Sequence, residues 1–182
     1  MKGLIACVML LATGWSVAAE TPAVSLYDLE EHLVLQNGRS AMLDVHRGNK
    51  VLITMFYGGC QATCPMIIET LRSVESKLDA TGRQQLRVLL ISFDPEHDTP
   101  LALRDLAVAR RIDTTRWTLA SADSAAVRRI AAALEIQFRR LPEGQISHAN
   151  VITVLGSGGE ILARSTRLGS ADDNLVQALR GR

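Results

Sequence analysis

The chain has almost no excess of charge, with 20 basic and 19 acidic residues among its 182. A nucleic-acid partner favours a basic protein face, so this balance argues against one. Cysteine is also scarce, because the sequence contains three and one of them, Cys7, lies close to the N-terminus. The other two are too few for a disulfide-framework protein. The sequence also lacks repeats, low-complexity tracts and Pro/Gly-rich linkers, so we expect a single domain.

The sequence lacks an apolar run of roughly 20 residues, the length that a transmembrane helix needs. A shorter apolar stretch, residues 4–12, follows Lys2 and is itself followed by Val17-Ala18-Ala19. This order is typical of a secretory signal peptide, so residues 1–19 are predicted to be removed on export. Residues 20–182 then form the mature single domain, and an uncleaved membrane anchor is the alternative.

Apolar patterns predict strands that alternate with helices along the mature chain. Asn37-Gly38 marks a turn between two short strands within residues 32–43. Further strands are predicted at 51–57, 86–93, 117–120, 151–155 and 160–163, and helices at 65–77, 99–111, 124–134 and 171–179. This order indicates an α/β, thioredoxin-like three-layer fold with a central mixed β-sheet and an N-terminal β-hairpin.

Four chemically active side chains lie next to the ends of predicted strands. Cys60 and Cys64 follow the first central strand, and Asp94 follows the second. His148 precedes a strand that we expect to run antiparallel to these two. An antiparallel strand starts at the edge where its parallel neighbours end, and ligands collect at that edge. The two thiols, the carboxylate and the imidazole are therefore expected at one rim of the sheet.

The cysteine pair has three interpretations. A purely structural disulfide closes a very short loop and contributes about 2 kcal/mol at most in the chain-entropy model. The alternatives are a dithiol that cycles with a disulfide and a clamp for a soft metal ion. Both sulfurs lie near the start of a predicted helix, whose partial positive charge is expected to lower the pKa of the thiols. The spacing alone leaves redox chemistry and metal binding open.

Other side chains near the cysteines have less specific signals. A lone histidine such as His148 is ordinarily a surface residue, but its place at the cysteine rim makes it a functional candidate. His97 lies in a polar loop and is expected to be solvated. Met55 and Met66 neighbour the cysteines and could offer thioethers to a metal, but we expect both to pack in the core.

Three motifs in this order resemble the Sco/SenC family. They are Cys60-Gln61-Ala62-Thr63-Cys64-Pro65, Asp94-Pro95-Glu96-His97-Asp98-Thr99-Pro100, and His148 in Ile146-Ser147-His148-Ala149-Asn150-Val151. The resemblance covers essentially the whole mature chain. It implies a thioredoxin-like fold, an export signal or membrane tether, and one copper ion bound by Cys60, Cys64 and His148. It also implies assembly of the binuclear copper site of cytochrome c oxidase, with subunit II as acceptor and a separate copper donor.

The ligand chemistry agrees with this resemblance. Two thiolates and one imidazole form a soft set of low coordination number that suits Cu(I), with Cu(II) as a second state. A structural zinc site would need a fourth protein ligand, for which Asp94 is the candidate. Asp94 and Asp98 are instead expected to order their loop through turns and helix capping. We therefore expect a periplasmic copper metallochaperone, soluble or weakly tethered to the membrane and facing the periplasm, rather than an enzyme.

The alternative function is a thiol-disulfide oxidoreductase. In that case Cys60 and Cys64 are a catalytic redox pair that reduces the cysteines of an acceptor protein. Redox proteins of this fold usually have two residues between the cysteines, whereas this chain has three. His148 discriminates between the two functions, since thiol exchange can survive its loss. A peroxidase is disfavoured because no Pro-x-x-x-Thr-x-x-Cys pattern surrounds either cysteine.

Overall fold

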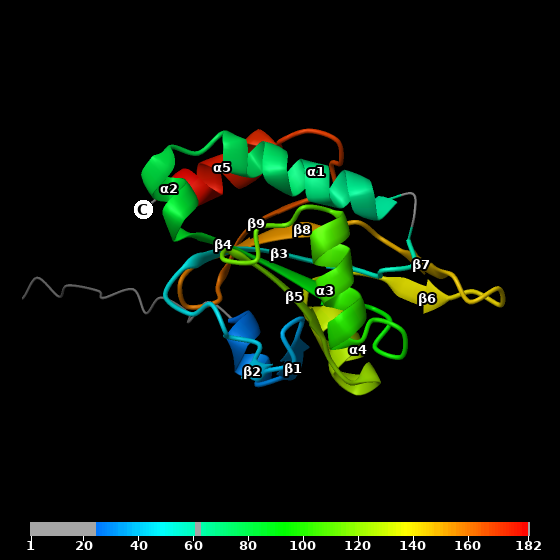
Figure 1. Cartoon of the computed structure of the whole chain (residues 1–182). Coiled ribbons are helices and arrows are strands. Elements are labelled where there is room, and N and C mark those ends of the chain that lie inside the picture. The colour runs from blue at the N-terminus through cyan, green and yellow to red at the C-terminus, as the bar shows by residue number, and fades with distance from the viewer. Residues whose placement is uncertain (1–24, 61–62, 182) are drawn as a thin grey trace, which may run out of the picture.

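The computed structural model describes residues 25–60 and 63–181, which form a central sheet with helices on both faces (Figure 1). The sheet has seven strands in the order β2-β1-β5-β4-β3-β8-β9. Strands β3, β4 and β5 are parallel, and the remaining pairs are antiparallel, so the sheet is mixed. The strands are β1 (His32–Leu35), β2 (Ser40–Met42), β3 (Lys50–Phe56), β4 (Leu86–Ser92), β5 (Trp117–Ser121), β8 (Ile152–Leu155) and β9 (Ile161–Ser165).

The helices cover the two faces of the sheet in separate groups. One face is covered by α1 (Thr63–Ser76), α3 (Pro100–Ala109) and α5 (Asp173–Arg180), and a short helix, α2 (Ala80–Gln85), connects α1 to β4. The other face is covered by the 3-10 helix η1 (Leu26–Leu29) and by α4 (Ser124–Ala133). Neighbouring residues of a strand point to opposite faces, so Leu52 packs on the first side and Ile53 on the second. The molecule thus has two apolar cores separated by the sheet.

The predicted architecture is confirmed: the protein is α/β, with three layers, a central mixed sheet and an N-terminal hairpin. The hairpin of β1 and β2 turns at Gly38, whose positive φ of 80° suits glycine. The structure also contains η1 and α2, which the apolar patterns did not predict. The predicted leader, residues 1–19, and the residues Gln61 and Ala62 lie outside the described residues.

A second, two-stranded sheet was also not predicted. It consists of β6 (Phe138–Arg140) and β7 (Ile146–His148), which pair antiparallel with Phe138 opposite His148. His148 is therefore the last residue of a strand rather than part of a loop. The hairpin lies at the same end of the molecule as the start of α1 (Figure 1).

One buried carboxylate in the core beneath α1 receives hydrogen bonds from two other side chains. Glu75 on α1 is 8% exposed, and its Oε1 accepts hydrogen bonds from the Trp117 indole at 3.1 Å and from Arg116 at 2.7 Å. A buried carboxylate left without such donors would destabilise the fold. These contacts tie α1 to β5 across the layer.

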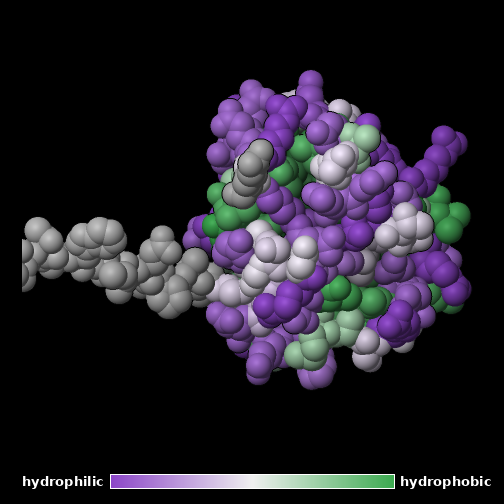
Figure 2. Space-filling view, turned by 90° about the vertical axis from the view of Figure 1, so that its left-hand side faces the viewer, coloured by the Kyte–Doolittle hydropathy of each residue, from purple (hydrophilic) through white to green (hydrophobic). Residues whose placement is uncertain are grey.

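The surface away from the β6–β7 hairpin is mostly polar. The end that carries α2 and the C-terminus is largely hydrophilic, with hydrophobic patches between the hydrophilic residues (Figure 2). Across residues 25–60 and 63–181, none of the helices combines the length and apolar character needed to cross a bilayer.

Candidate metal centre

The carboxyl ends of β3 and β4 lie side by side, because the two strands pair in parallel with Phe56 opposite Ser92. Cys60 follows β3 and Asp94 follows β4, so both lie at this edge of the sheet. Strand β8 pairs antiparallel with β3 and begins near the same edge, and the segment before it carries His148. The topology thus agrees with the predicted placement of these side chains at one rim.

Both cysteines of the described chain are buried thiols, with 8% of Cys60 and 6% of Cys64 exposed. The carbonyl oxygen of Tyr57 accepts a hydrogen bond from the Cys60 backbone N–H at 3.1 Å and another from the Cys64 thiol at 3.3 Å. Both side chains line a small cavity of about 10 Å³, which has room for about one water molecule. Two soft sulfur atoms are therefore held together in an apolar pocket.

The environment of Cys64 corrects one expectation from the sequence. Burial raises the pKa of the Cys64 thiol to about 12, and proximity to Cys60 adds to the effect. The hydrogen bond to Tyr57 opposes this shift but is outweighed. Although Cys64 lies in the first turn of α1, desolvation of the thiolate is larger than the stabilisation expected from the helix N-terminus. The Cys64 thiol is accordingly protonated near neutral pH.

His148 presents its imidazole at the end of β7, packed against aromatic rings. Its ring centroid lies 4.8 Å from that of Phe93 and 6.1 Å from that of Tyr57, the latter in an edge-on arrangement of 85°. The His148 Nδ1 lies 3.2 Å from the Ala149 carbonyl oxygen, which can only accept, so Nδ1 carries the proton. Burial lowers the pKa of His148. The ring is therefore neutral near pH 7, with the lone pair of Nε2 left for a metal.

Tyr57 contacts both halves of the predicted site. Tyr57 lines the same cavity as Cys60 and Cys64, its hydroxyl is hydrogen-bonded to the Cys60 side chain, and its ring is edge-on to that of His148. Burial raises the pKa of the Tyr57 phenol, and proximity to Cys60 raises it further, while the backbone amide of Ile146 on β7 opposes the shift. The tyrosine thus connects the cysteine loop with the hairpin that carries His148. No sequence signal indicated this role, because a residue at a strand end is ordinarily a packing residue.

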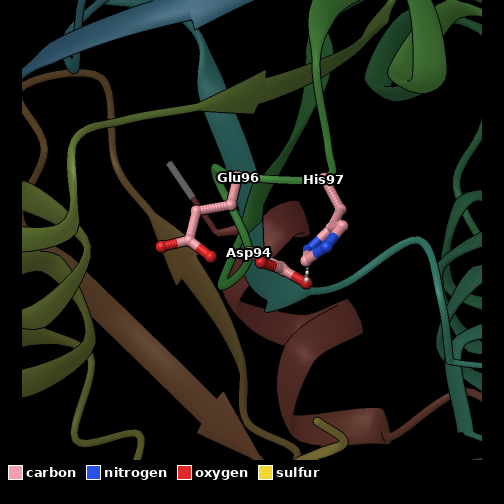
Figure 3. Close-up of side chains that lie close together, drawn as sticks. All are labelled: Asp94, Glu96 and His97. Carbon is pink, nitrogen blue, oxygen red and sulfur yellow. Dashed lines mark hydrogen bonds and ion pairs between the residues drawn. The ribbon is translucent and has the colours of Figure 1, made fainter.

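The loop after β4 contains a cluster of three potential ligands, Asp94, Glu96 and His97, shown in Figure 3. Their oxygen and nitrogen atoms lie within 4.8 Å of one another. However, Asp94 already accepts from Arg140 at 2.9 Å through Oδ1 and from His97 at 2.9 Å through Oδ2. Although burial acts against ionisation, these two partners lower the pKa of Asp94 overall. A cation here would compete with the Arg140 guanidinium, so the cluster is better explained as an ion-pair network that orders the loop.

Asp98 fixes the start of the cysteine loop from the same segment. Its Oδ2 accepts hydrogen bonds from the Ser92 hydroxyl and, at 2.9 Å, from the Gly58 backbone N–H. Burial raises the pKa of Asp98, against the effect of these donors. The helix cap itself is Thr99, whose hydroxyl accepts from the Ala102 N–H at 3.3 Å. Asp98 therefore orders the loop across strands rather than by capping α3.

The structure brings the predicted ligands to one region, but their donor atoms are not close enough together to bind one ion. In residues 25–60 and 63–181, three potential ligand atoms lie within 4.8 Å of one another in the Asp94 cluster. The donor atoms of Cys60, Cys64 and His148 do not all lie that close together. Met55 is 1% exposed and packs in the core as predicted. Met66 is 46% exposed, so the expectation that it packs in the core is wrong. It follows Cys64 by two positions and therefore points away from the buried face of α1.

Comparison with known proteins identifies the chain. The SCO1/SenC family model matches residues 25–181. The chain belongs to the SCO1/SenC family. Because the match spans nearly all of the described residues, the family assignment applies to the whole domain and includes the cysteine loop, the Asp94 loop and His148.

Two curated relatives of the SCO1/SenC domain are similar over most of it. A SCO1 protein homolog of Bacillus subtilis (strain 168) is 24% identical over 130 residues, which are 70% of this chain and 67% of the relative. A putative copper-binding protein of Stutzerimonas stutzeri is 25% identical over 133 residues, 71% of this chain and 64% of the relative. The chain thus spans about two thirds of the length of these relatives.

Solved structures show the same fold. A putative electron transfer protein from Aquifex aeolicus VF5 superposes with a TM-score of 0.74 and 26% identity, over 83% of this chain and 88% of that one. The copper-bound ScoI of Arabidopsis thaliana superposes with a TM-score of 0.71 and 13% identity, over 84% and 97% of the two chains. The predicted thioredoxin-like fold and the predicted family are therefore confirmed. The assignment of Cys60, Cys64 and His148 as metal ligands stays a prediction.

Proposed function

We propose that this SCO1/SenC protein is an exported copper chaperone. It binds one copper ion through Cys60, Cys64 and His148 and delivers the ion to a copper enzyme. The proposed acceptor is cytochrome c oxidase, at its binuclear copper site. Copper is its cargo. The relative from Stutzerimonas stutzeri is named as copper-binding, and the Arabidopsis thaliana relative is described with copper bound. Both descriptions support copper as the metal for this family member.

The observation that carries the proposal is the pair of adjacent buried thiols at the sheet edge that also carries a neutral imidazole. Two sulfurs and one nitrogen are soft donors and form the kind of incomplete set that suits Cu(I). A set of three ligands also leaves a side open to an acceptor ligand. Since the thiol of Cys64 is protonated near neutral pH, Cu(I) must displace its proton to the solvent. Copper affinity is therefore expected to rise with pH.

The oxidoreductase alternative receives less support from the same geometry. Thiol exchange needs an accessible thiolate, whereas Cys64 is buried and its pKa is raised to about 12. The thiolate fraction of Cys64 at neutral pH is consequently small. The raised pKa of Cys64 weakens metal binding less than thiol exchange, because the bound metal ion itself favours loss of the thiol proton.

The experiment is an anaerobic Cu(I) titration of the reduced mature protein against a colorimetric Cu(I) chelator. The wild type is compared with Cys60→Ala, Cys64→Ala and His148→Ala. We expect one equivalent of tightly bound Cu(I), no tight binding without either cysteine, and an affinity at least about tenfold lower in His148→Ala. Unchanged affinity in His148→Ala would remove the histidine from the ligand set, and absence of binding in the wild type would refute the proposal.

Delivery and export need their own measurements. Cu(I)-loaded protein is mixed with the soluble copper-binding domain of oxidase subunit II, and the metal content of each protein is measured after separation. Transfer to this domain, and not to an unrelated copper protein, is the expected result. For export, the mass of protein recovered from the periplasm should correspond to a chain that begins at Glu20. An intact N-terminus in the membrane fraction would indicate the anchored form instead.

A further inference from the structure

The predicted copper ligands lie in two groups, and one aromatic residue, Tyr57, contacts both. Cys60 and Cys64 line one cavity, and Tyr57 lines it with them. His148 is not among the residues that line this cavity, and its ring centroid lies 6.1 Å from that of Tyr57. Ligands of a single ion need bonds of about 2 Å, so their donor atoms must approach within about 4 Å of one another. The donor atoms of Cys60, Cys64 and His148 do not meet this condition, because among the described residues these three do not all lie within 4.8 Å of one another.

The backbone beneath Tyr57 is held in place, which leaves its side chain as the mobile part. The Tyr57 carbonyl accepts hydrogen bonds from Cys60 at 3.1 Å and Cys64 at 3.3 Å. The next residue, Gly58, donates its N–H to the buried Asp98 carboxylate at 2.9 Å. With the carbonyl and the following amide both engaged, the ring can move mainly by rotation about its side-chain bonds.

The wall opposite Tyr57 is also fixed. The His148 ring packs on Phe93 at 4.8 Å, and Phe93 packs on Phe138 at 4.9 Å. Phe93 is 3% exposed and follows β4 directly, so this side of the site belongs to the core. Tyr57 is only partly buried and has a route to solvent. Of the rings around the imidazole, Tyr57 is therefore the one that can rotate outward, at the cost of the hydrogen bonds that its hydroxyl makes with the Ile146 backbone N–H and the Cys60 side chain.

We propose that the Tyr57 side chain is the gate of the copper site. In the metal-free protein its ring covers the two thiols and keeps them apart from His148. When a copper ion arrives, the ring rotates outward and lets Cys60, Cys64 and His148 converge on the metal. This inference rests on the proposed function, because it assumes that these three residues bind the ion. Tyr57 acts as a positioning residue and does not itself bind copper.

The first test uses the metal-free protein, so that it does not depend on copper. The rate of alkylation of Cys60 and Cys64 by iodoacetamide is measured by peptide mass spectrometry in the wild type, Tyr57→Ala, Tyr57→Leu and Tyr57→Phe. Removing the ring should raise the rate about tenfold, because access limits a shielded thiol. Tyr57→Phe keeps the ring and should restore the wild-type rate. Equal alkylation rates in all folded variants overturn the proposed gate. Tyr57→Leu replaces Tyr57→Ala in this comparison if Tyr57→Ala does not fold.

The second test measures copper exchange by stopped-flow mixing with a colorimetric Cu(I) chelator. Tyr57→Ala should speed both loading and release by about tenfold or more, with a smaller change in the equilibrium affinity. The same substitution in a His148→Ala background should have a smaller effect, because no third ligand then has to be admitted. Rates within twofold of the wild type overturn the gate. If the wild type binds no copper, the proposed function fails, and the alkylation rates still decide whether the ring covers the thiols.

Discussion

At the scale of single residues, Gly58 shows how closely the cysteine loop is fitted to the loop after β4. A Cβ atom on Gly58 would overlap Asp98 Oδ1, while the Gly58 N–H donates to Asp98 Oδ2. Asp98 is buried and cannot move away without losing its hydrogen bond from Ser92. The loop that carries Cys60 is thus fixed by a contact that only glycine permits.

Gly58→Ala is therefore expected to lower the free energy of unfolding by about 1–3 kcal/mol, as overpacking of a tight site does. Urea unfolding of the mature protein measures the change. Gly59→Ala is the matched control, because its Cβ would meet the Tyr57 ring at an ordinary 3.5 Å. An equal decrease in the free energy of unfolding in the two variants would show that Asp98 moves aside at little cost. The contact of Gly58 with Asp98 would then not determine the stability of the loop.

The raised pKa of Cys64 gives a second prediction. Alkylation at Cys64 itself in the folded protein should still accelerate above pH 10, because burial raises the pKa of this thiol to about 12. In protein unfolded by urea, the rate should level off near the ordinary thiol value of 9.0. Quenched reactions read by mass spectrometry give both profiles. Similar midpoints in the folded and unfolded protein would contradict the burial described for Cys64.

At the scale of elements, the β6–β7 hairpin is the least supported part of the site. Its two strands pair with each other and not with the central sheet. Such a two-stranded hairpin is marginally stable alone. It is held to the body by the Phe138–Phe93 contact and by the ion pair of Arg140 with Asp94 at 2.9 Å. His148, at the end of β7, depends on these contacts for its position.

Arg140→Gln should therefore loosen the hairpin while leaving the central sheet intact. Amide hydrogen exchange is expected to become faster in residues 138–148 and to stay unchanged in β3 and β4. Arg139→Gln is the control, because Arg139 is exposed and forms no ion pair among residues 25–60 and 63–181. If both substitutions change exchange equally, charge rather than the specific pair to Asp94 would be the cause.

The elements also show what sequence patterns can and cannot predict. Strands β3 and β4 are long, buried and apolar, so their patterns predicted them and placed Cys60 and Asp94 at one edge. The β6–β7 hairpin was missed because each strand has three residues and β6 contains two arginines. Helix α2 was missed because it has six residues and none of them is buried, so it carries no apolar period. The place of the Tyr57 ring depends on its rotamer and on packing between distant segments, which a pattern does not encode.

At the scale of the whole molecule, the face covered by η1 and α4 lies away from the cysteines yet contributes to the response to acid. His46 lies between β2 and β3 and its Nε2 is 3.0 Å from the Thr118 hydroxyl on β5. Burial, with a further contribution from Arg87, lowers the pKa of His46 from 6.5 to about 4. The folded protein therefore keeps this imidazole neutral at a pH where the unfolded chain has already protonated it.

This difference predicts that stability decreases on mild acidification. Below pH 6.5 the unfolded state binds a proton that the folded state does not bind until about pH 4. The free energy of unfolding should thus be highest above 6.5 and fall steadily as pH falls towards 4. Urea unfolding at several pH values measures the slope, which should be flatter in His46→Asn than in the wild type. His32→Asn, at an exposed position, should keep the wild-type slope; a flattening there would contradict the assignment.

The contact of Trp117 with Glu75 also gives the protein a built-in optical reporter. The sequence has two tryptophans, Trp15 and Trp117, so the chain after residue 19 carries one. Its indole is 2% exposed and packs in the same apolar core as both cysteines. Emission from such a shielded ring is expected at short wavelength and should move to longer wavelength on unfolding. Each variant described above can therefore be checked for an intact core by its own fluorescence, without a label and at the dilution used for copper exchange.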